Sequence, residues 1–174
     1  MRDLRYGIEI EMTGLSRGKA AETLAGFFGT RAEHTGGSYD AYAVRDAQDR
    51  VWKLVSDGSI QTQKKVRGQT VAADSTYSVA VVSPVCVYED IGTIQEIVRA
   101  LRRNSALVND SCGIHVHVGA EKFDAQHLRN ITNIMASKEE LIYKALQVDL
   151  NRSQDYCRRV EQRFLRQVNE KKPQ

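Results

Sequence analysis

Apolar and polar residues alternate strictly at two distant places in the chain, residues 4–12 and 112–119. A period of two is typical of a β-strand with one buried face and one face towards solvent, so both stretches predict strands of a half-buried sheet. The polar positions hold two glutamates in the first stretch and two histidines in the second. The polar face of the sheet is therefore the expected place for a functional site.

The other segments predict an α+β fold. Helical periodicity and capping residues predict helices over residues 16–28 and 89–103, and others starting near 124, at a Ser137/Glu140 capping box, and near 155. Further strands are expected at 39–45, 50–56 and 76–83. Because these short strands follow one another without a helix, we expect hairpins, and hence a largely antiparallel sheet with helices packed on one face.

Length and composition limit the domain organisation. With 174 residues, of which 41% are hydrophobic, the chain is expected to form a single domain over 1–174. The polar, basic segment 61–74 shows no periodicity and is predicted to be a mobile loop, and 170–174 a flexible tail.

Composition also narrows the function classes. The three cysteines form no Cys-x-x-Cys pair, which argues against a disulfide framework and a thiolate zinc site and favours a cytoplasmic location. No segment approaches the roughly 20 apolar residues of a membrane span. The net charge of +3 comes from residues 152–172, which contain seven basic and three acidic residues. Because no aromatic residues are interleaved with them as in nucleic-acid-binding motifs, we expect neither nucleic acid nor membrane as a partner.

Glu9 and Glu11 form the first candidate site. In a strand their side chains project from the same side, roughly 7 Å apart, and could share a hard cation. Mg²⁺ prefers carboxylate oxygens and keeps coordination positions for substrate phosphates. Taken alone, however, Glu-x-Glu is more simply explained as the solvated face of a half-buried strand.

His115 and His117 repeat this geometry between two glycines, where a backbone could approach a ligand closely. Two imidazoles on one face can bind a metal or donate hydrogen bonds to phosphate. The pairing of half of the chain's four histidines in one strand favours a site over a structural role.

A third candidate is the segment 52–60, in which a strand runs into an Asp-Gly turn. Asp57 and Ser59 would lie at the strand end, where they could contact a substrate, and Lys53 could meet a phosphate. A tight hairpin turn with a solvated lysine is an equally good explanation of the same residues.

Taken in order, four segments resemble the signature segments of the amidoligase family: 7–12 (GIEIEM), 52–60 (WKLVSDGSI), 81–84 (VVSP) and 112–119 (CGIHVHVG). Asn151-Arg152 with Tyr156-Cys157 is similar to a later segment. The resemblance implies a glutamine synthetase-like fold and ATP-dependent joining of a carboxylate to an amine through an acyl phosphate.

The resemblance also implies roles for individual residues. Glu9, Glu11 and His115 would bind Mg²⁺, His117 would act in catalysis and contact the nucleotide phosphates, and Asp57 would be catalytic. Lys53 and Ser59 would contact ATP. The substrates, a carboxylate and an amine, would be small molecules or peptides.

The sequence departs from the family pattern in two ways. Ala80 stands where the family usually has a glutamate ligand immediately before the VVSP segment, so this form is open to being inactive. Family members also continue further, so the chain resembles an N-terminal part whose C-terminal part is missing or is supplied by another chain or a homo-oligomer. A catalytically silent nucleotide- or peptide-binding module of the same fold and a zinc hydrolase using His115 and His117 are the alternatives.

Overall fold

The computed structural model of the chain describes residues 4–148, 154 and 157–170. Its contacts divide the chain, for which the sequence favoured one domain, into two compact units, residues 1–119 and 120–174. Each unit is described by itself.

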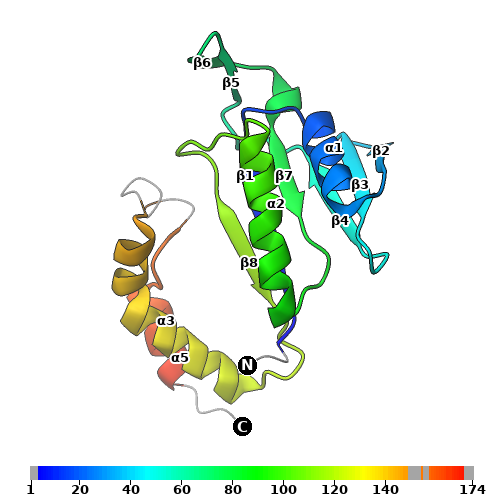
Figure 1. The fold of residues 1–174 in the computed structure, drawn as a ribbon. Coiled ribbons are helices and arrows are strands. Elements are labelled where there is room, and N and C mark those ends of the chain that lie inside the picture. Colours follow the sequence, from blue (N-terminus) through cyan, green and yellow to red (C-terminus); the bar gives the residue numbers. More distant parts are fainter. Residues whose placement is uncertain (1–3, 149–153, 155–156, 171–174) are drawn as a thin grey trace. The chain divides into compact units, whose positions relative to one another are not determined.

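The first unit is built on a six-stranded sheet in which every neighbouring pair is antiparallel (Figure 1). The strand order is β2-β3-β4-β7-β1-β8. The bounds are β1 Tyr6–Met12, β2 Ala32–Gly36, β3 Ala41–Arg45, β4 Val51–Val55, β7 Val79–Val82 and β8 Ile114–Val118. The predicted α+β class with a largely antiparallel sheet is therefore confirmed.

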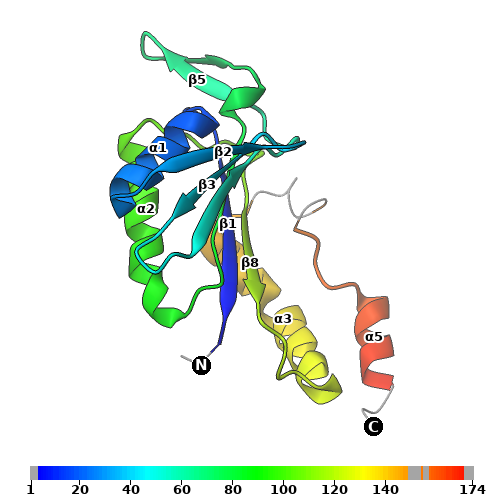
Figure 2. The same cartoon turned by 90° about the vertical axis from the view of Figure 1, so that its right-hand side faces the viewer.

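Two helices, α1 (Arg17–Phe28) and α2 (Ile91–Arg103), lie on the same side of this sheet (Figure 2). Helix α1 begins where the Ser16 hydroxyl accepts a hydrogen bond from the amide of Lys19, and ends at Gly29 in the left-handed conformation. Short 3-10 turns, η1 (Ser75–Tyr77) and η2 (Tyr88–Asp90), precede β7 and α2.

Strand alternation divides the sheet into a face covered by α1 and α2 and an open face. Residues of the covered face and of the two helices form one buried cluster, which includes Met12, Leu24, Val44, Trp52, Leu54, Val81, Ile97 and Leu101. At the β8 edge the aliphatic residues of the same face remain exposed, with relative accessibilities of 67% for Ile114, 59% for Val116 and 50% for Val118. The alternation in residues 112–119 had predicted one buried face for this strand, and this face is exposed here.

Segment 61–74, predicted to be a mobile loop, contains a regular hairpin. Strands β5 (Gln63–Val66) and β6 (Gln69–Ala72) pair with each other to form a separate two-stranded sheet. The turn between them places Arg67 and Gly68 at positive φ. The hairpin is fixed at its base because the amide of Gln63 donates to the Thr13 hydroxyl, which donates in turn to the Gln63 carbonyl.

The second unit contains α3 (Ala125–Leu146) and α5 (Gln162–Glu170), which contact each other through hydrogen bonds between Asn133 and Asn169. The expected break at Ser137 is wrong, because α3 continues through it. The Ser137 hydroxyl donates to the carbonyl of Ile134 in the preceding turn instead of capping a new helix. The tail expected at 170–174 lies, apart from Glu170, outside the described residues, as does the expected helix start near 155.

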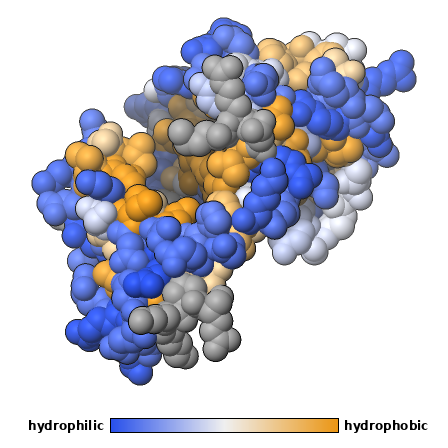
Figure 3. Space-filling model, turned by 90° about the horizontal axis from the view of Figure 1, so that it is seen from below, coloured by the Kyte–Doolittle hydropathy of each residue, from blue (hydrophilic) through white to orange (hydrophobic). Residues whose placement is uncertain are grey.

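Apolar side chains also reach the surface of both units, and Figure 3 shows several of them on the face it presents. In the second unit Leu128, Ile134 and Leu141 are among the exposed ones. No helix within the described ranges combines the length and apolar character that crossing a bilayer requires.

An ion-pair network fastens the β3–β4 turn to the start of α2. Arg50 donates to both carboxylate oxygens of Asp90, at 2.9 Å each, and to Asp46 at 2.8 Å. The Asp46 side chain is only 2% exposed and also accepts from the Trp52 indole. The hydrogen bonds from Arg50 hold the pKa of Asp90 below its usual value, although burial opposes this.

Replacing Arg50 with methionine is expected to lower the free energy of unfolding by about 3 kcal/mol at pH 7, because it leaves the buried Asp46 charge uncompensated. Since the lowered pKa of Asp90 gives stability that is present above its unfolded-state value, the difference between wild type and variant should shrink below about pH 4. Urea unfolding between pH 2 and 7 measures both effects. Arg99→Met, at an exposed ion pair with Glu96, is the control and should change stability by less than about 1 kcal/mol.

Candidate active site

The register of β1 and β8 places the acidic and imidazole residues on the same face. Glu9 pairs directly with His115, and Gly7 pairs with His117. Directly opposed residues of an antiparallel pair point to the same side of the sheet, and Glu11 lies two residues further along the same face. This is the open face, opposite α1 and α2. The structure therefore brings together the two residue pairs that lie about a hundred positions apart in the sequence.

The Glu11 carboxylate contacts two other residues of the site. Its Oε1 lies 3.0 Å from Nε2 of His115, and its Oε2 accepts a 2.6 Å hydrogen bond from the amide of Gly113. Glu11 is only 5% exposed, whereas the His115 side chain is 49% exposed. The buried carboxylate thus orients an imidazole that remains accessible to a ligand.

Asp57 joins this group from the turn after β4. The Ser59 hydroxyl and the Ser59 amide each donate to Asp57 Oδ1 at 2.7 Å. These hydrogen bonds are the main cause of a lowered Asp57 pKa, to which His115 and Glu11 also contribute while burial opposes it. The hydrogen bonds from Ser59 therefore stabilise the ionised form of the Asp57 carboxylate.

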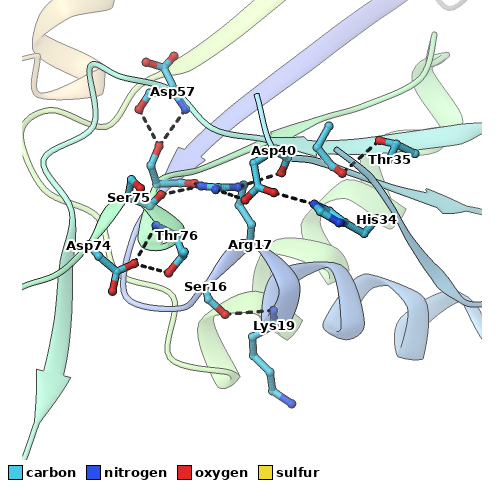
Figure 4. Close-up of polar contacts among 12 residues, drawn as sticks. Ser16, Arg17, Lys19, His34, Thr35, Asp40, Asp57, Asp74, Ser75 and Thr76 are labelled. Carbon is cyan, nitrogen blue, oxygen red and sulfur yellow. Dashed lines mark hydrogen bonds and ion pairs between the residues drawn. The ribbon is translucent and has the colours of Figure 1, made fainter. Parts of the chain in front are cut away.

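Ser78 and Arg17 hold the backbone at Asp57, a feature that sequence reasoning missed. The Ser78 hydroxyl accepts from the amide of Asp57 at 2.8 Å and donates to its carbonyl at 2.6 Å. Arg17, at the start of α1 and 3% exposed, donates to the carbonyls of Ser75 and Ser78 and forms an ion pair with Asp40 (Figure 4). No periodicity marks Arg17 as buried, so only its contacts identify this role.

Asp40 completes the support around Arg17. It lies between Arg17 and His34, whose Nε2 is 2.6 Å from Asp40 Oδ1 (Figure 4). The hydrogen bond from Arg17, followed by that with His34, lowers the pKa of Asp40. The network links β2, the turn before β3, α1 and the segment before β7.

Ala80 lies beside Glu11 on the open face. The β1–β7 register pairs Glu11 with Ala80, and Ala80 pairs on its other side with Val55 of β4. Ala80 has no exposed surface. A glutamate at this position would therefore project next to the Glu11 carboxylate.

Lys53, His117 and Ser59 occupy more open positions. Lys53 pairs with Val82, and Val82 pairs with Glu9, so Lys53 lies two strands from Glu9 on the same face. All three side chains are exposed. Lys53 and His117 make no side-chain hydrogen bond or ion pair within the part of the chain that the structure describes.

The donor set for a metal is incomplete in this arrangement. Among the described residues, no three or more His, Cys, Asp and Glu side chains are placed to hold one ion. Both Glu11 oxygens are engaged by His115 and Gly113, and the neighbouring position that could supply another carboxylate is Ala80. Two carboxylates on one face suit Mg²⁺ in kind, but as they stand they do not form a closed site. A three-ligand zinc centre of a hydrolase has no support in these residues either.

Comparison with known proteins agrees with the ordered motifs. A family model described as "putative amidoligase enzyme" matches residues 2–174. No curated protein and no solved structure matches the chain. The later motif at Asn151-Arg152 and Tyr156-Cys157 lies, apart from Cys157, outside the described residues, but the match extends across it. The chain belongs to the amidoligase family.

Proposed function

We propose that the open face of the sheet catalyses ATP-dependent joining of a carboxylate to an amine. The observation that carries the proposal is the contact between the Glu11 carboxylate and the His115 imidazole on the open face, where Glu9 pairs directly with His115. An accessible imidazole held by a buried carboxylate is an arrangement suited to a polar, charged ligand.

The proposed reaction has two steps. An oxygen of the substrate carboxylate attacks the terminal phosphorus of ATP, and ADP leaves with the electrons of the broken P–O bond. The amine nitrogen then attacks the acyl carbon of the acyl phosphate, inorganic phosphate leaves, and the nitrogen releases a proton. Mg²⁺, when bound, would neutralise negative charge on the phosphate oxygens.

Each polar residue of the open face would have its own role in this reaction. Glu9 and Glu11 would supply carboxylate ligands to Mg²⁺ together with His115, which requires Glu11 and His115 to exchange their present contact with each other for contacts with the ion. His117 would donate a hydrogen bond to a phosphate oxygen. Asp57, whose pKa is lowered by its hydrogen bonds from Ser59, would accept a hydrogen bond from the incoming amine.

Lys53 and Ser59 would contact the ATP phosphates. Both lie on or beside β4, with Lys53 directed to the open face two strands from Glu9. The Ser59 hydroxyl now donates to Asp57, so to bind a phosphate it would turn and donate its proton to a phosphate oxygen instead.

One observation favours a second candidate function, a catalytically silent nucleotide- or peptide-binding module. Ala80 pairs directly with Glu11 and supplies no carboxylate at the position where the family resemblance implies a glutamate. Loss of one carboxylate ligand weakens Mg²⁺ binding, and phosphoryl transfer depends on neutralising the phosphate charges. The fold and the binding face would be retained in such a protein while turnover is lost.

The test uses hydroxylamine, which traps acyl phosphates as hydroxamates. The protein is incubated with ATP, Mg²⁺, hydroxylamine and a panel of carboxylates, and ADP, phosphate and hydroxamate are measured. Carboxylate-dependent hydroxamate formation is expected, and Glu11→Gln should reduce it by about 100-fold or more. Glu96→Gln, on the exposed surface of α2, should leave it unchanged. Nucleotide binding without ADP release for any carboxylate would contradict ligation and support the silent module.

A further inference from the structure

A hollow lies on the open face of the sheet, over β2, β3 and β4, at the other end of the sheet from His115. It has a volume of about 900 Å³ and is lined by residues of β2, β3 and β4 and of the adjoining turns. Lys53 is part of this lining, so the hollow adjoins the proposed reaction site. A cavity of this size suits a small organic ligand.

The strand register explains why the surface is hollowed there. Glu33 of β2 pairs with Ala43 of β3, and Ala43 pairs with Lys53 of β4. The two charged side chains thus flank a single methyl group, with their backbones separated by two strand spacings, or about 10 Å. The same row continues through Val82 to Glu9. A ligand resting on Ala43 would therefore reach Lys53 and, beyond it, the proposed reaction site.

Three of the charged side chains that line the hollow have no partner among the described residues. Arg31, Glu33 and Lys53 all line it, and none of them makes a side-chain hydrogen bond or ion pair to any described residue. Arg45 and Asp49, at its rim, are paired with each other at 3.1 Å. The hollow therefore presents two unpaired cations and one unpaired anion.

We propose that this hollow binds the carboxylate substrate, and that the substrate is a molecule with two carboxylates and one ammonium group. An acidic amino acid carries these three groups, and so does a dipeptide that ends in an acidic residue. The ammonium pairs with Glu33, one carboxylate pairs with Arg31, and the reacting carboxylate lies at Lys53, on the side nearest Glu9. The assignment rests on the proposed ligation for its purpose, but the binding itself is independent of turnover.

Binding is tested without nucleotide or metal, by titrating the ¹⁵N-labelled protein with L-aspartate and following the amide signals. Saturable shifts are expected at Glu33, Ala43 and Lys53. N-acetyl-L-aspartate lacks the ammonium and L-asparagine lacks the second carboxylate, so each should bind about fivefold more weakly. Comparison with L-alanyl-L-aspartate distinguishes a free amino acid from a peptide end as the preferred source. Shifts confined to other surfaces, or equal affinity for all four probes, would overturn the proposal.

Variants identify the contacts. Arg31→Ala should weaken L-aspartate binding about fivefold, and Glu33→Gln should weaken it while removing the difference between L-aspartate and its N-acetyl form. Arg102→Ala, an exposed cation on α2 at the other face of the sheet, should have no effect. An unchanged affinity of both hollow variants would contradict the assignment.

The failures of the two proposals are distinguishable. Specific L-aspartate binding in the hollow, with no hydroxamate formed from any carboxylate, would retain this site and remove ligation. Hydroxamate formation with an unchanged KM for the carboxylate in Arg31→Ala and Glu33→Gln would retain ligation and remove this site.

Discussion

Replacing Gly14 with alanine is expected to destabilise the protein by about 4 kcal/mol. Gly14 has φ of 88°, a conformation that residues with a side chain rarely adopt. An added Cβ would lie 2.4 Å from the carbonyl oxygen of Ser105 and 2.7 Å from the amide nitrogen of Leu107. Both are backbone atoms and cannot rotate away. Thermal and urea unfolding measure the loss.

Backbone hydrogen bonds fix the chain around Gly14, directly after β1. The preceding residue, Thr13, exchanges two backbone hydrogen bonds with Leu107, and the amide of Gly14 donates to Gln63. The control is Gly26→Ala in α1, where no atom lies within 4 Å of the added Cβ. That change should stabilise the protein by about 0.5 to 1 kcal/mol. Similar stabilities for the two variants would show that the Gly14 contact does not exist in solution.

Ala80→Glu is expected to have opposite effects with and without Mg²⁺. In EDTA the buried glutamate would lie beside Glu11, and overpacking and charge repulsion should lower the free energy of unfolding by about 3 kcal/mol. Mg²⁺ at about 100 times its Kd should restore about 2.7 kcal/mol. The restored carboxylate should also raise Mg²⁺-dependent ATP turnover.

Ala80→Gln separates charge from volume in this experiment. Glutamine has nearly the shape of glutamate, so it should destabilise the protein by overpacking, but Mg²⁺ should neither rescue it nor raise its turnover. Calorimetric unfolding in EDTA and in Mg²⁺, with phosphate release measured in parallel, gives both readouts. If Mg²⁺ changed neither the stability nor the turnover of Ala80→Glu, Ala80 would not belong to the metal site.

The strands that carry the candidate site could be predicted because their periodicity is strong. Alternation around Glu9 and around His115 fixes which side chains share a face, and the register then pairs these two residues. The sequence does not specify which strands are neighbours. Strand β1, for example, lies between β7 and β8, which are both distant from it in the chain. Their juxtaposition depends on contacts between distant segments.

Other elements were mispredicted for local reasons. The β5–β6 hairpin lacks alternating apolar residues because none of its side chains is fully buried, so no period of two appears in its sequence. Strand β2 (AEHTG) was missed because it is short, polar and ends in glycine. At Ser137 the side chain satisfied a carbonyl within α3, and a capping pattern alone cannot distinguish the two uses.

The residues that hold the site in place, Arg17 and Ser78, were the least predictable from the sequence. Arg17 is buried by carbonyls from residues about sixty positions away, and Ser78 holds Asp57 from a segment that shows no motif. A buried arginine gives no hydropathy signal, because its burial depends on partners that only the folded chain brings together. The same holds for the hollow at Ala43, which arises from the register of three strands.

The most direct test of the proposed active site is a crystal structure of the protein with Mg²⁺ and a nonhydrolysable ATP analogue. The proposal predicts the phosphates over the open face, within hydrogen-bonding distance of His115 or His117 and with Mg²⁺ at the Glu9 and Glu11 carboxylates. A nucleotide bound against the face that carries α1 and α2, or away from the histidine strand, would contradict it.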